Sequence, residues 1–214
     1  MNVRIVGGGI SGISAAKVAL KEGHKVTILE STSEVGGLMA RIANCRVGFT
    51  TFFDEIRENP GLKVITGSTI SSVEKKGGVF SVTLENGQSL QADRVVIATG
   101  LTPYDPVEYK GKRVLTSLEY DKVIDQRMGE LPEDFKRVAF VLCVGSRCEE
   151  YTLCSSVCCS YTIREIKWTL QRAKPEIKVF YNDTRFFGQE FYLEKLYRDA
   201  GVKFVRANSR YFDE

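Results

Sequence analysis

The stretch VRIVGGGISG, residues 3–12, decides the fold of the amino-terminal part of the chain. Its apolar start predicts a short buried strand over Val3–Val6, and the G-x-G-x-x-G pattern that follows predicts a tight turn into a helix. We expect that helix over Ile13–Glu22. A strand, a glycine turn and a helix in this order indicate an α/β fold of the Rossmann type.

Each glycine of the turn has a physical reason. Gly7 permits the sharp turn, Gly9 lets the backbone approach a pyrophosphate, and Gly12 lets the helix pack closely on the strand. The helix start, with Ile10 and Ser11, would offer free backbone N–H groups to the phosphates. The turn therefore predicts a dinucleotide site.

The next strand strengthens this prediction. Lys25–Leu29 is apolar and ends at Glu30, whose carboxylate is placed to accept hydrogen bonds from a ribose. An acid at this position favours a free hydroxyl over a phosphate, because the phosphate would be repelled. The alternative, a glycine-rich turn without a ligand, does not explain why the strands and the acid stand in the right order.

Two later motifs distinguish a flavin from a nicotinamide dinucleotide. Residues 33–39, SEVGGLM, contain paired glycines that would let the backbone pass the pyrophosphate and the ribityl chain, although a flexible loop has the same composition. Residues 92–100, ADRVVIATG, are an apolar strand that closes on Ala-Thr-Gly. With these motifs, the first part resembles the FAD-binding half of the thioredoxin-reductase-like flavoproteins. The resemblance implies FAD contacts from Gly36, Gly37, Met39, Val73, Thr99 and Gly100.

The segment between these motifs predicts a helix over Phe49–Glu58 and then a β-meander over one face of the parallel sheet. The strands expected there are Leu62–Thr66, Thr69–Glu74, Phe80–Leu84 and Ser89–Ala92. Asn86-Gly87 predicts a type I′ hairpin turn.

A polar stretch with two prolines, Tyr104–Arg113, predicts a hinge, so we assign residues 1–105 to an FAD-binding domain and residues 106–214 to a second domain. In the second domain strands alternate with helices, which predicts a parallel βαβαβ unit. We expect helices over Leu118–Met128, Tyr161–Arg172 and Gln189–Asp199, and strands over Arg137–Leu142, Ile177–Asn182 and Val202–Arg206.

Five of the six cysteines lie in Val138–Arg164, and the sixth is Cys45. A strand, a cysteine-bearing loop and a helix follow one another where a nucleotide-binding domain has its phosphate loop. The resembled reductases bind nicotinamide at a second glycine fingerprint, whereas this chain has CVGSR at residues 143–147. We therefore expect no nicotinamide at this position.

Four of the cysteines, Cys143, Cys154, Cys158 and Cys159, have the spacing C-x10-C-x3-C-C. This spacing is neither a ferredoxin run nor a zinc finger, and it shows only that four thiolates can converge. An iron–sulfur cluster, a zinc site and a redox-active thiol pair all stay open on the residues alone.

The residues of this segment carry a second resemblance. CVGSR, then CSSVCCSY, together with LTSLEY at residues 115–120 and DTRFFG at residues 183–188, resembles the flavin and iron–sulfur A subunits of heterodisulfide reductases and the related flavoprotein subunits of quinone-interacting membrane oxidoreductase complexes. In that family the four matching cysteines hold a [4Fe–4S] cluster near the flavin. The resemblance also implies other iron–sulfur subunits as partners.

The chain departs from that family in two respects. It has no C-x2-C-x2-C-x3-C-P ferredoxin run, and it ends at Glu214, before the strand and helix that would complete the flavin site. Relative to the family the chain is truncated, and we expect either a piece of a longer protein or split system, or a compact form with weaker flavin affinity.

Charge and hydropathy exclude some classes of function. With 30 basic and 27 acidic residues and a net charge of +3, the chain has no long basic run, so nucleic acid is not an expected partner. No apolar run is long enough to span a bilayer, and the chain starts directly in a structured motif, which predicts a cytoplasmic protein. In that reducing setting, clustered cysteines favour metal binding or catalysis over structural disulfides.

The sequence thus predicts a flavin and iron–sulfur electron-transfer oxidoreductase without an acid–base catalytic residue. One alternative is an NAD(P)H-dependent thiol–disulfide reductase that uses a cysteine pair. Another is a non-catalytic structural or assembly subunit.

Overall fold

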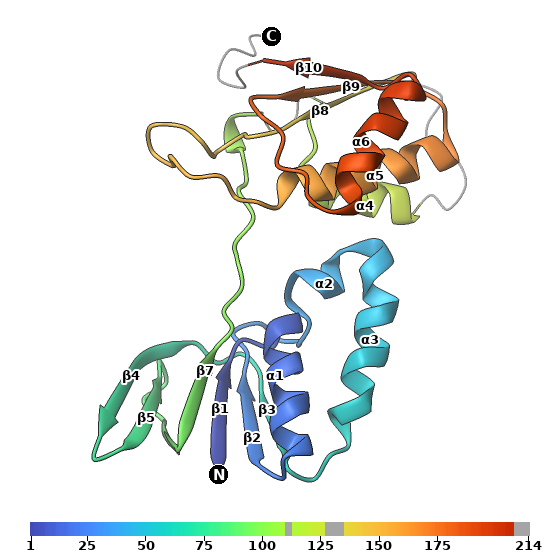
Figure 1. The fold of residues 1–214 in the computed structure, drawn as a ribbon. Helices are drawn as coiled ribbons and strands as arrows, with labels where there is room; N and C mark the ends of the chain where they lie inside the picture. Colours follow the sequence, from blue (N-terminus) through green and yellow to red (C-terminus); the bar gives the residue numbers. More distant parts are fainter. Residues whose placement is uncertain (110–112, 127–134, 208–214) are drawn as a thin grey trace. The chain divides into compact units, whose positions relative to one another are not determined.

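The computed structural model describes residues 1–109, 113–126 and 135–207. The chain divides into two compact units, Met1–Thr102 and Pro103–Glu214, each with its own parallel sheet (Figure 1). The predicted α/β class with two Rossmann-like parts is confirmed. None of the described helices is long and apolar enough to cross a bilayer.

The first unit has a four-stranded parallel sheet in the order β3-β2-β1-β7. Its strands are β1 (Asn2–Val6), β2 (Lys25–Leu29), β3 (Leu62–Ile65) and β7 (Arg94–Ile97). Because the strands are parallel, their carboxyl ends meet at one edge of the sheet. The glycine turn after β1, the acid after β2 and the segment after β7 therefore come together.

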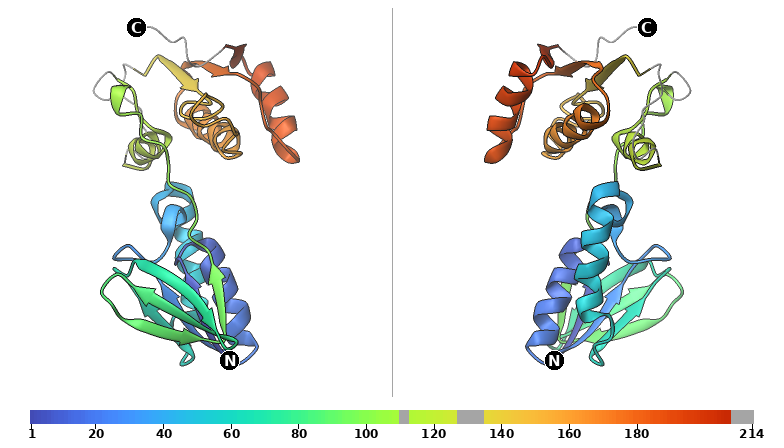
Figure 2. Two further views of the ribbon diagram at one scale, coloured as in Figure 1. Left: turned by 90° about the vertical axis from the view of Figure 1, so that its left-hand side faces the viewer. Right: turned by 90° about the vertical axis from the view of Figure 1, so that its right-hand side faces the viewer.

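Helices cover one face of this sheet and a meander covers the other (Figure 2). Helices α1 (Ile10–Lys21) and α3 (Ala43–Arg57) bury Ile13 and Phe53 against the strands, and the short α2 (Gly37–Arg41) precedes α3. The meander consists of β4 (Ile70–Lys76), β5 (Val79–Leu84) and β6 (Ser89–Ala92), and its Val82 and Leu84 pack under Leu29.

Two details of this region differ from prediction. The strand expected over Leu62–Thr66 pairs with β2 in the main sheet and is not part of the meander. The Asn86-Gly87 turn is not type I′, because Gly87 has a positive φ of 84° while Asn86 is not among the positive-φ residues. The loop instead closes by the bond from Gly87 N–H to the Leu84 carbonyl oxygen, at 2.9 Å.

The second unit has a three-stranded parallel sheet in the order β10-β9-β8. The chain runs through a short 3-10 turn, η1 (Val107–Tyr109), and then α4 (Ser117–Gln126), β8 (Arg137–Val141), α5 (Cys158–Arg172), β9 (Glu176–Tyr181), α6 (Gln189–Asp199) and β10 (Lys203–Arg206). Side chains from all three helices pack on Phe140, Ile177 and Val179, so the helices cover one face of the sheet (Figure 1).

Two functionally important helices begin earlier than predicted. Helix α1 starts at Ile10 instead of Ile13, and α5 starts at Cys158 instead of Tyr161. Neither start carries the side-chain cap by which a sequence usually announces a helix. Consequently Cys158 and Cys159 lie on the first turn of a helix and not in the loop. The predicted helix end at Met128 and the side chain of Cys45 lie outside the described residues.

Candidate functional site

The glycine turn after β1 is packed too tightly for any side chain at two positions. A Cβ on Gly12 would lie 1.9 Å from the Gly7 carbonyl oxygen, and a Cβ on Gly7 would lie 2.2 Å from the Ala98 carbonyl oxygen. Gly7 also has a φ of 102° and donates its N–H to the Leu29 carbonyl oxygen at 2.8 Å. These glycines join β1, β2, β7 and the start of α1 at one point.

Gly9, unlike Gly7 and Gly12, is not closely packed. A Cβ built there would meet nothing within 4 Å, so open space lies beside the start of α1. No side-chain hydrogen bond caps α1 at Gly9. The backbone N–H groups of Ile10 and Ser11, which have no partner four residues earlier in the helix, are therefore able to bind an anion.

The second glycine pair lies against the first turn. Gly36 donates its N–H to the Gly8 carbonyl oxygen at 2.8 Å, and a Cβ on Gly37 would lie 3.3 Å from Gly9 Cα. Both have positive φ, 132° and 53°, which the chain needs in order to turn back over the first loop. Met39, two residues into α2, packs against the core of the unit.

Glu30 is buried, with 6% of its surface exposed, and is surrounded by protein donors. The N–H of Gly8 donates to Oε2 at 2.7 Å, while the N–H and hydroxyl of Thr32 donate to Oε1 at 2.8 and 2.9 Å. Burial opposes ionisation, but these hydrogen bonds outweigh it and hold the pKa of Glu30 below its ordinary value. The acid thus ties the glycine turn to the loop after β2, and its contact with a ribose remains a prediction.

The other predicted flavin residues divide into two sets. A Cβ on Gly7 would lie 3.2 Å from Thr99 Cα, so Thr99 and the following Gly100 start beside the glycine turn. Val73 lies on β4, where it pairs with Val82 and is 40% exposed, and its described contacts are within the meander.

These observations allow a test of whether the residues fit FAD. The opening at Gly9, the uncapped start of α1 and the glycine pair folded over it form a cradle of backbone donors, and a side chain at Gly9 would intrude on it. A pyrophosphate is the anion such a cradle suits. The first unit therefore fits a dinucleotide.

The second site is the cysteine loop, Leu142–Val157, with the first turn of α5. Cys143 and Cys159 are buried and Cys158 is partly buried, and all are free thiols. Cys158 Sγ accepts hydrogen bonds from the Cys159 thiol, the Cys143 backbone N–H and the Ser155 hydroxyl. The structure therefore brings three of the four predicted ligands together.

Hydrogen bonds shift the pKa values of the two adjacent thiols, Cys158 and Cys159, in opposite directions. The bond from Cys159 lowers the pKa of Cys158, with smaller contributions from Cys143 and Ser155 that together outweigh burial. The same bond, reinforced by burial and by the charge of neighbouring thiolates, raises the pKa of Cys159. One thiolate with one thiol as its donor is thus the stable form of this pair.

Cys154 lies farther along the loop. Its Sγ accepts a hydrogen bond from Ser156 N–H at 3.3 Å, and the residue lines a hollow of about 410 Å³ together with Gly145, Ser146, Tyr151, Leu153 and Ser155. Cys148, which is not among the predicted ligands, accepts a hydrogen bond at Sγ from Tyr151 N–H at 3.4 Å. Within the described part of the chain, no three His, Cys, Asp or Glu side chains are arranged to hold a metal ion.

The donor set nevertheless fits an iron–sulfur cluster in kind. Cysteine side chains are the usual ligands of such clusters, and three of the predicted ones lie near one another at one end of the sheet. The fourth, Cys154, belongs to the loop that begins at Cys143.

A ring covers the position in the second unit that corresponds to Gly9. Gly145 is the third residue of the turn that begins at Cys143, as Gly9 is of the turn that begins at Gly7, and a Cβ on Gly145 would lie 2.5 Å from the Tyr104 ring. The surface that a pyrophosphate would approach is therefore occupied by an aromatic side chain.

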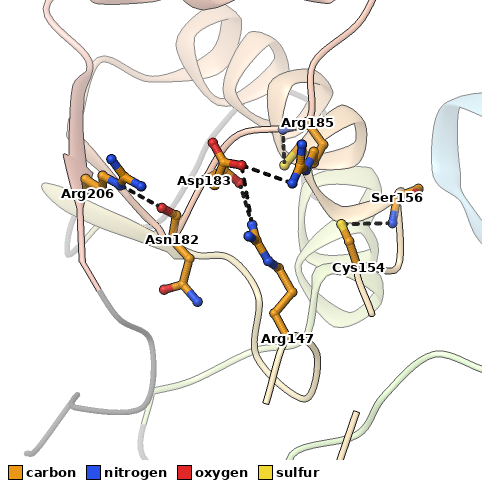
Figure 3. A network of polar contacts seen from close by, with 8 residues as sticks. Arg147, Cys154, Ser156, Asn182, Asp183, Arg185 and Arg206 are labelled. Atoms are coloured by element: carbon orange, nitrogen blue, oxygen red, sulfur yellow. Dashed lines mark hydrogen bonds and ion pairs between the residues drawn. The ribbon is translucent and has the colours of Figure 1, made fainter. Parts of the chain in front are cut away.

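A set of charged residues lies beside the thiols (Figure 3). Asp183 forms ion pairs with Arg147 at 3.8 Å and with Arg185 at 3.2 Å, and Arg206 donates to the Asn182 carbonyl oxygen at 2.9 Å. The segments that carry these residues are far apart in sequence. Only DTRFFG, as a motif of the resemblance, pointed to this loop.

The comparisons with known proteins agree with this architecture. The sequence model of the family described as pyridine nucleotide-disulphide oxidoreductase matches residues 1–128. The A subunit of the H(2):CoB-CoM heterodisulfide,ferredoxin reductase of Methanothermobacter thermautotrophicus is 33% identical over 141 residues, which cover 55% of this chain and 21% of that protein.

A second relative extends over nearly the whole chain. An iron-sulfur A subunit of the CoB–CoM heterodisulfide reductase of Methanopyrus kandleri is 24% identical over 318 residues, covering 96% of this chain and 47% of that protein. Because this alignment is longer than the 214-residue chain, the relative carries segments that this chain lacks. The chain spans less than half the length of these relatives.

Solved structures confirm the fold. The thioredoxin reductase of Lactococcus lactis has a TM-score of 0.64 at 14% identity, with 96% of this chain and 64% of that chain covered. The thioredoxin reductase of T. acidophilum has a TM-score of 0.63 at 20% identity, with 95% and 63% covered. The similarity to the A subunits of heterodisulfide reductases is confirmed as well, and the chain belongs to the pyridine nucleotide-disulphide oxidoreductase family.

Proposed function

We propose that this chain is a flavin and iron–sulfur electron-transfer subunit, with residues 1–105 as its FAD-binding domain and residues 106–214 as its cluster-binding domain. The observation that carries the proposal is the convergence of Cys143, Cys158 and Cys159 at the place where a second phosphate loop would lie. When bound, FAD would accept electrons in pairs and a [4Fe–4S] cluster would pass them singly.

In the first unit the residues bind and orient. The N–H groups of Ile10 and Ser11 would hold the pyrophosphate, and Gly36 with Gly37 would enclose it. Glu30, ionised at neutral pH, would orient the adenosine ribose through the accepting capacity that its protein donors leave. Thr99 and Gly100 would line the approach to the flavin ring of FAD.

In the second unit Cys143, Cys154, Cys158 and Cys159 would be the four cluster ligands. The low pKa of Cys158 favours it as the first thiolate to bind iron, since the thiolate is the ligand form. The proposal places the protein in the cytoplasm, beside other iron–sulfur subunits of a complex like that of its relatives. The electron donor and acceptor would come from those subunits.

Anaerobic purification tests the proposal directly. We expect a flavin spectrum, about four iron and four labile sulfides per chain, and loss of iron but not flavin in Cys158→Ser. Cys148→Ser is the matched control, because Cys148 lies in the same loop outside the ligand set and should keep its iron. Protein without flavin, iron and sulfide would refute the proposal, as would equal iron loss in both variants.

A second function is favoured by the Cys158–Cys159 hydrogen bond. A thiolate paired with a buried thiol is the arrangement of a thiol–disulfide reductase, for which Cys158 would be the nucleophile. Against it stands the Tyr104 ring over Gly145, which obstructs a nicotinamide phosphate. NAD(P)H-driven disulfide reduction that survives iron chelation but not Cys158→Ser would establish this function instead.

A further inference from the structure

The cysteine loop holds an unusual amount of backbone strain. Of the four non-glycine residues with positive φ in the described ranges, three lie in this loop: Cys143 at 66°, Arg147 at 57° and Ser156 at 59°. A residue with a side chain is strained in this region, so the conformation persists only where contacts hold it.

Local hydrogen bonds close the tip of the loop. Arg147 N–H donates to the Leu153 carbonyl oxygen at 3.3 Å, and Cys148 N–H donates to the Tyr151 carbonyl oxygen at 2.9 Å. The two ends of the loop are held differently, because the Cys143 N–H and the Ser155 hydroxyl both donate to Cys158 Sγ on α5.

Arg147 at the tip is connected to the rest of the unit through Asp183, in the loop between β9 and α6 (Figure 3). Arg147 extends from the cysteine loop to the Asp183 carbonyl oxygen at 3.5 Å and carboxylate at 3.8 Å. The same carboxylate oxygen binds Arg185 at 3.2 Å, and Arg185 donates its backbone N–H to Cys159 Sγ at 3.5 Å. Asp183 thus lies between the strained loop and a residue that touches a thiol.

The loop that carries Asp183 is itself held in place. Arg206, at the end of β10, donates to the Asn182 carbonyl oxygen at 2.9 Å. The side chains of Arg147 and Asp183 are 25% and 43% exposed, so their interaction is partly protected from solvent. One carboxylate shared by two guanidinium groups leaves a net positive charge beside the thiols.

We propose that Asp183 is a positioning residue of the thiol site. It fixes Arg147 and Arg185 at once, so that the strained cysteine loop stays folded over Cys159 and the local charge stays balanced. The inference deepens the proposed function. Its electrostatic part, the effect of these charges on a cluster, rests on the proposed function, whereas its mechanical part, the positioning of the loop, applies to the thiols without a cluster. Asp183 itself touches neither a thiol nor a substrate.

The first experiment uses the full chain free of metal. Iodoacetamide labelling of Cys159, followed by mass spectrometry, should be about fivefold faster in Asp183→Asn and in Arg147→Gln, the factor that corresponds to about 1 kcal/mol of lost contact. Asp183→Glu keeps the charge and should label close to the wild-type rate. The control is Glu176→Gln, which breaks the 3.0 Å pair of a similarly exposed carboxylate with Lys203, away from the thiols.

The second experiment separates charge from mere folding. In protein loaded with its cluster, Asp183→Asn removes a negative charge and should raise the reduction potential, whereas Arg147→Gln removes a positive charge and should lower it. A purely structural role would shift both potentials in the same direction, and that result would overturn the electrostatic part. Unchanged labelling in both variants would overturn the positioning role.

The two experiments distinguish failure of the proposed function from failure of the positioning role of Asp183. If no iron binds to wild-type protein, the cluster assignment is refuted, while the labelling rates still decide whether Asp183 positions the loop.

Discussion

The turn after β1 and the turn after β8 begin alike and continue differently, since three residues separate β1 from α1 whereas sixteen separate β8 from α5. Both contain a residue of positive φ near the strand end, Gly7 at 102° and Cys143 at 66°, and both lead to a helix. The first turn is open at Gly9, whereas the second is covered at Gly145 by the Tyr104 ring. A strand followed by a helix therefore presents backbone N–H groups in one unit and thiols in the other.

The two units also treat a buried carboxylate in opposite ways. Glu30 has donors on both oxygens and a lowered pKa. Glu165 on α5 is 1% exposed, and its side chain has one described hydrogen bond, from the Ser117 hydroxyl to Oε2 at 3.3 Å, with Oε1 unpartnered. Burial, together with the nearby charge of Asp121, outweighs the Ser117 hydrogen bond and Arg164 and raises the pKa of Glu165 to about 9. Burial alone thus does not determine the charge of an acid.

The largest expected effect contrasts two glycines of the first turn. Gly12→Ala places a methyl group 1.9 Å from a backbone oxygen and should cost more than about 3 kcal/mol of unfolding free energy, with all flavin lost. Gly9→Ala meets nothing within 4 Å at a φ of −78° and should keep its stability within about 0.5 kcal/mol, yet bind FAD at least about tenfold more weakly.

Urea unfolding followed by circular dichroism and FAD titration measure these two quantities. Flavin binding by Gly9→Ala at the wild-type level would place the pyrophosphate elsewhere and break the comparison between the two turns.

The next effect concerns how the buried carboxyl groups of Glu165 and Glu30 make stability depend on pH. The folded-state pKa of Glu165 lies above its unfolded value, so its contribution to stability is full below about pH 4.5 and is lost as the pH rises toward 9. Glu165→Gln removes this loss and should be more stable than wild type by roughly 3 kcal/mol at pH 8, but not at pH 4.5. Fluorescence of Trp168, the only tryptophan, reports unfolding of the second unit.

Glu30→Gln should behave in the opposite sense. Because the pKa of Glu30 is lowered on folding, its contribution is present above pH 4.5 and fades in acid, so the variant should be less stable than wild type at pH 7 and approach it near pH 3. Equal pH profiles for the two variants would contradict the assigned environments.

The smallest expected effect tests whether the positive φ of Cys143 is strained, at a turn position where the first unit has Gly7. Neither Cys143→Gly nor Cys143→Ala retains a thiol, but only glycine adopts a φ of 66° without strain. The glycine variant should be more stable by about 1 kcal/mol in metal-free protein, again by Trp168 fluorescence. A more stable alanine variant would show that the turn relaxes and that the two turns are not equivalent.

Sequence-based prediction worked best for features whose physical cause lies in nearby residues. Gly7 and Gly12 are required by backbone contacts within or beside their own turn, and alternating strands and helices follow from short apolar runs. The starts of α1 and α5 were missed because neither has a capping side chain. As a result, the helical position of Cys158 could not be predicted.

Features that depend on distant segments stayed out of reach. Asp183 meets Arg147 only because parallel strands bring their following loops to one edge of the sheet, and the spacing gives no sign of which charges will pair there. Glu165 shares the buried face of α5 with Thr162 and Ile166, a place where hydrophobic patterning would expect an apolar residue.

The uncapped first turn of α5 has a consequence for the groups that it can stabilise. A helix start with free N–H groups and the positive end of the helix dipole favours any anion, and a thiolate is an anion as a phosphate is. The start of α5 can therefore favour the thiolate form of Cys158, just as the start of α1 can favour a phosphate.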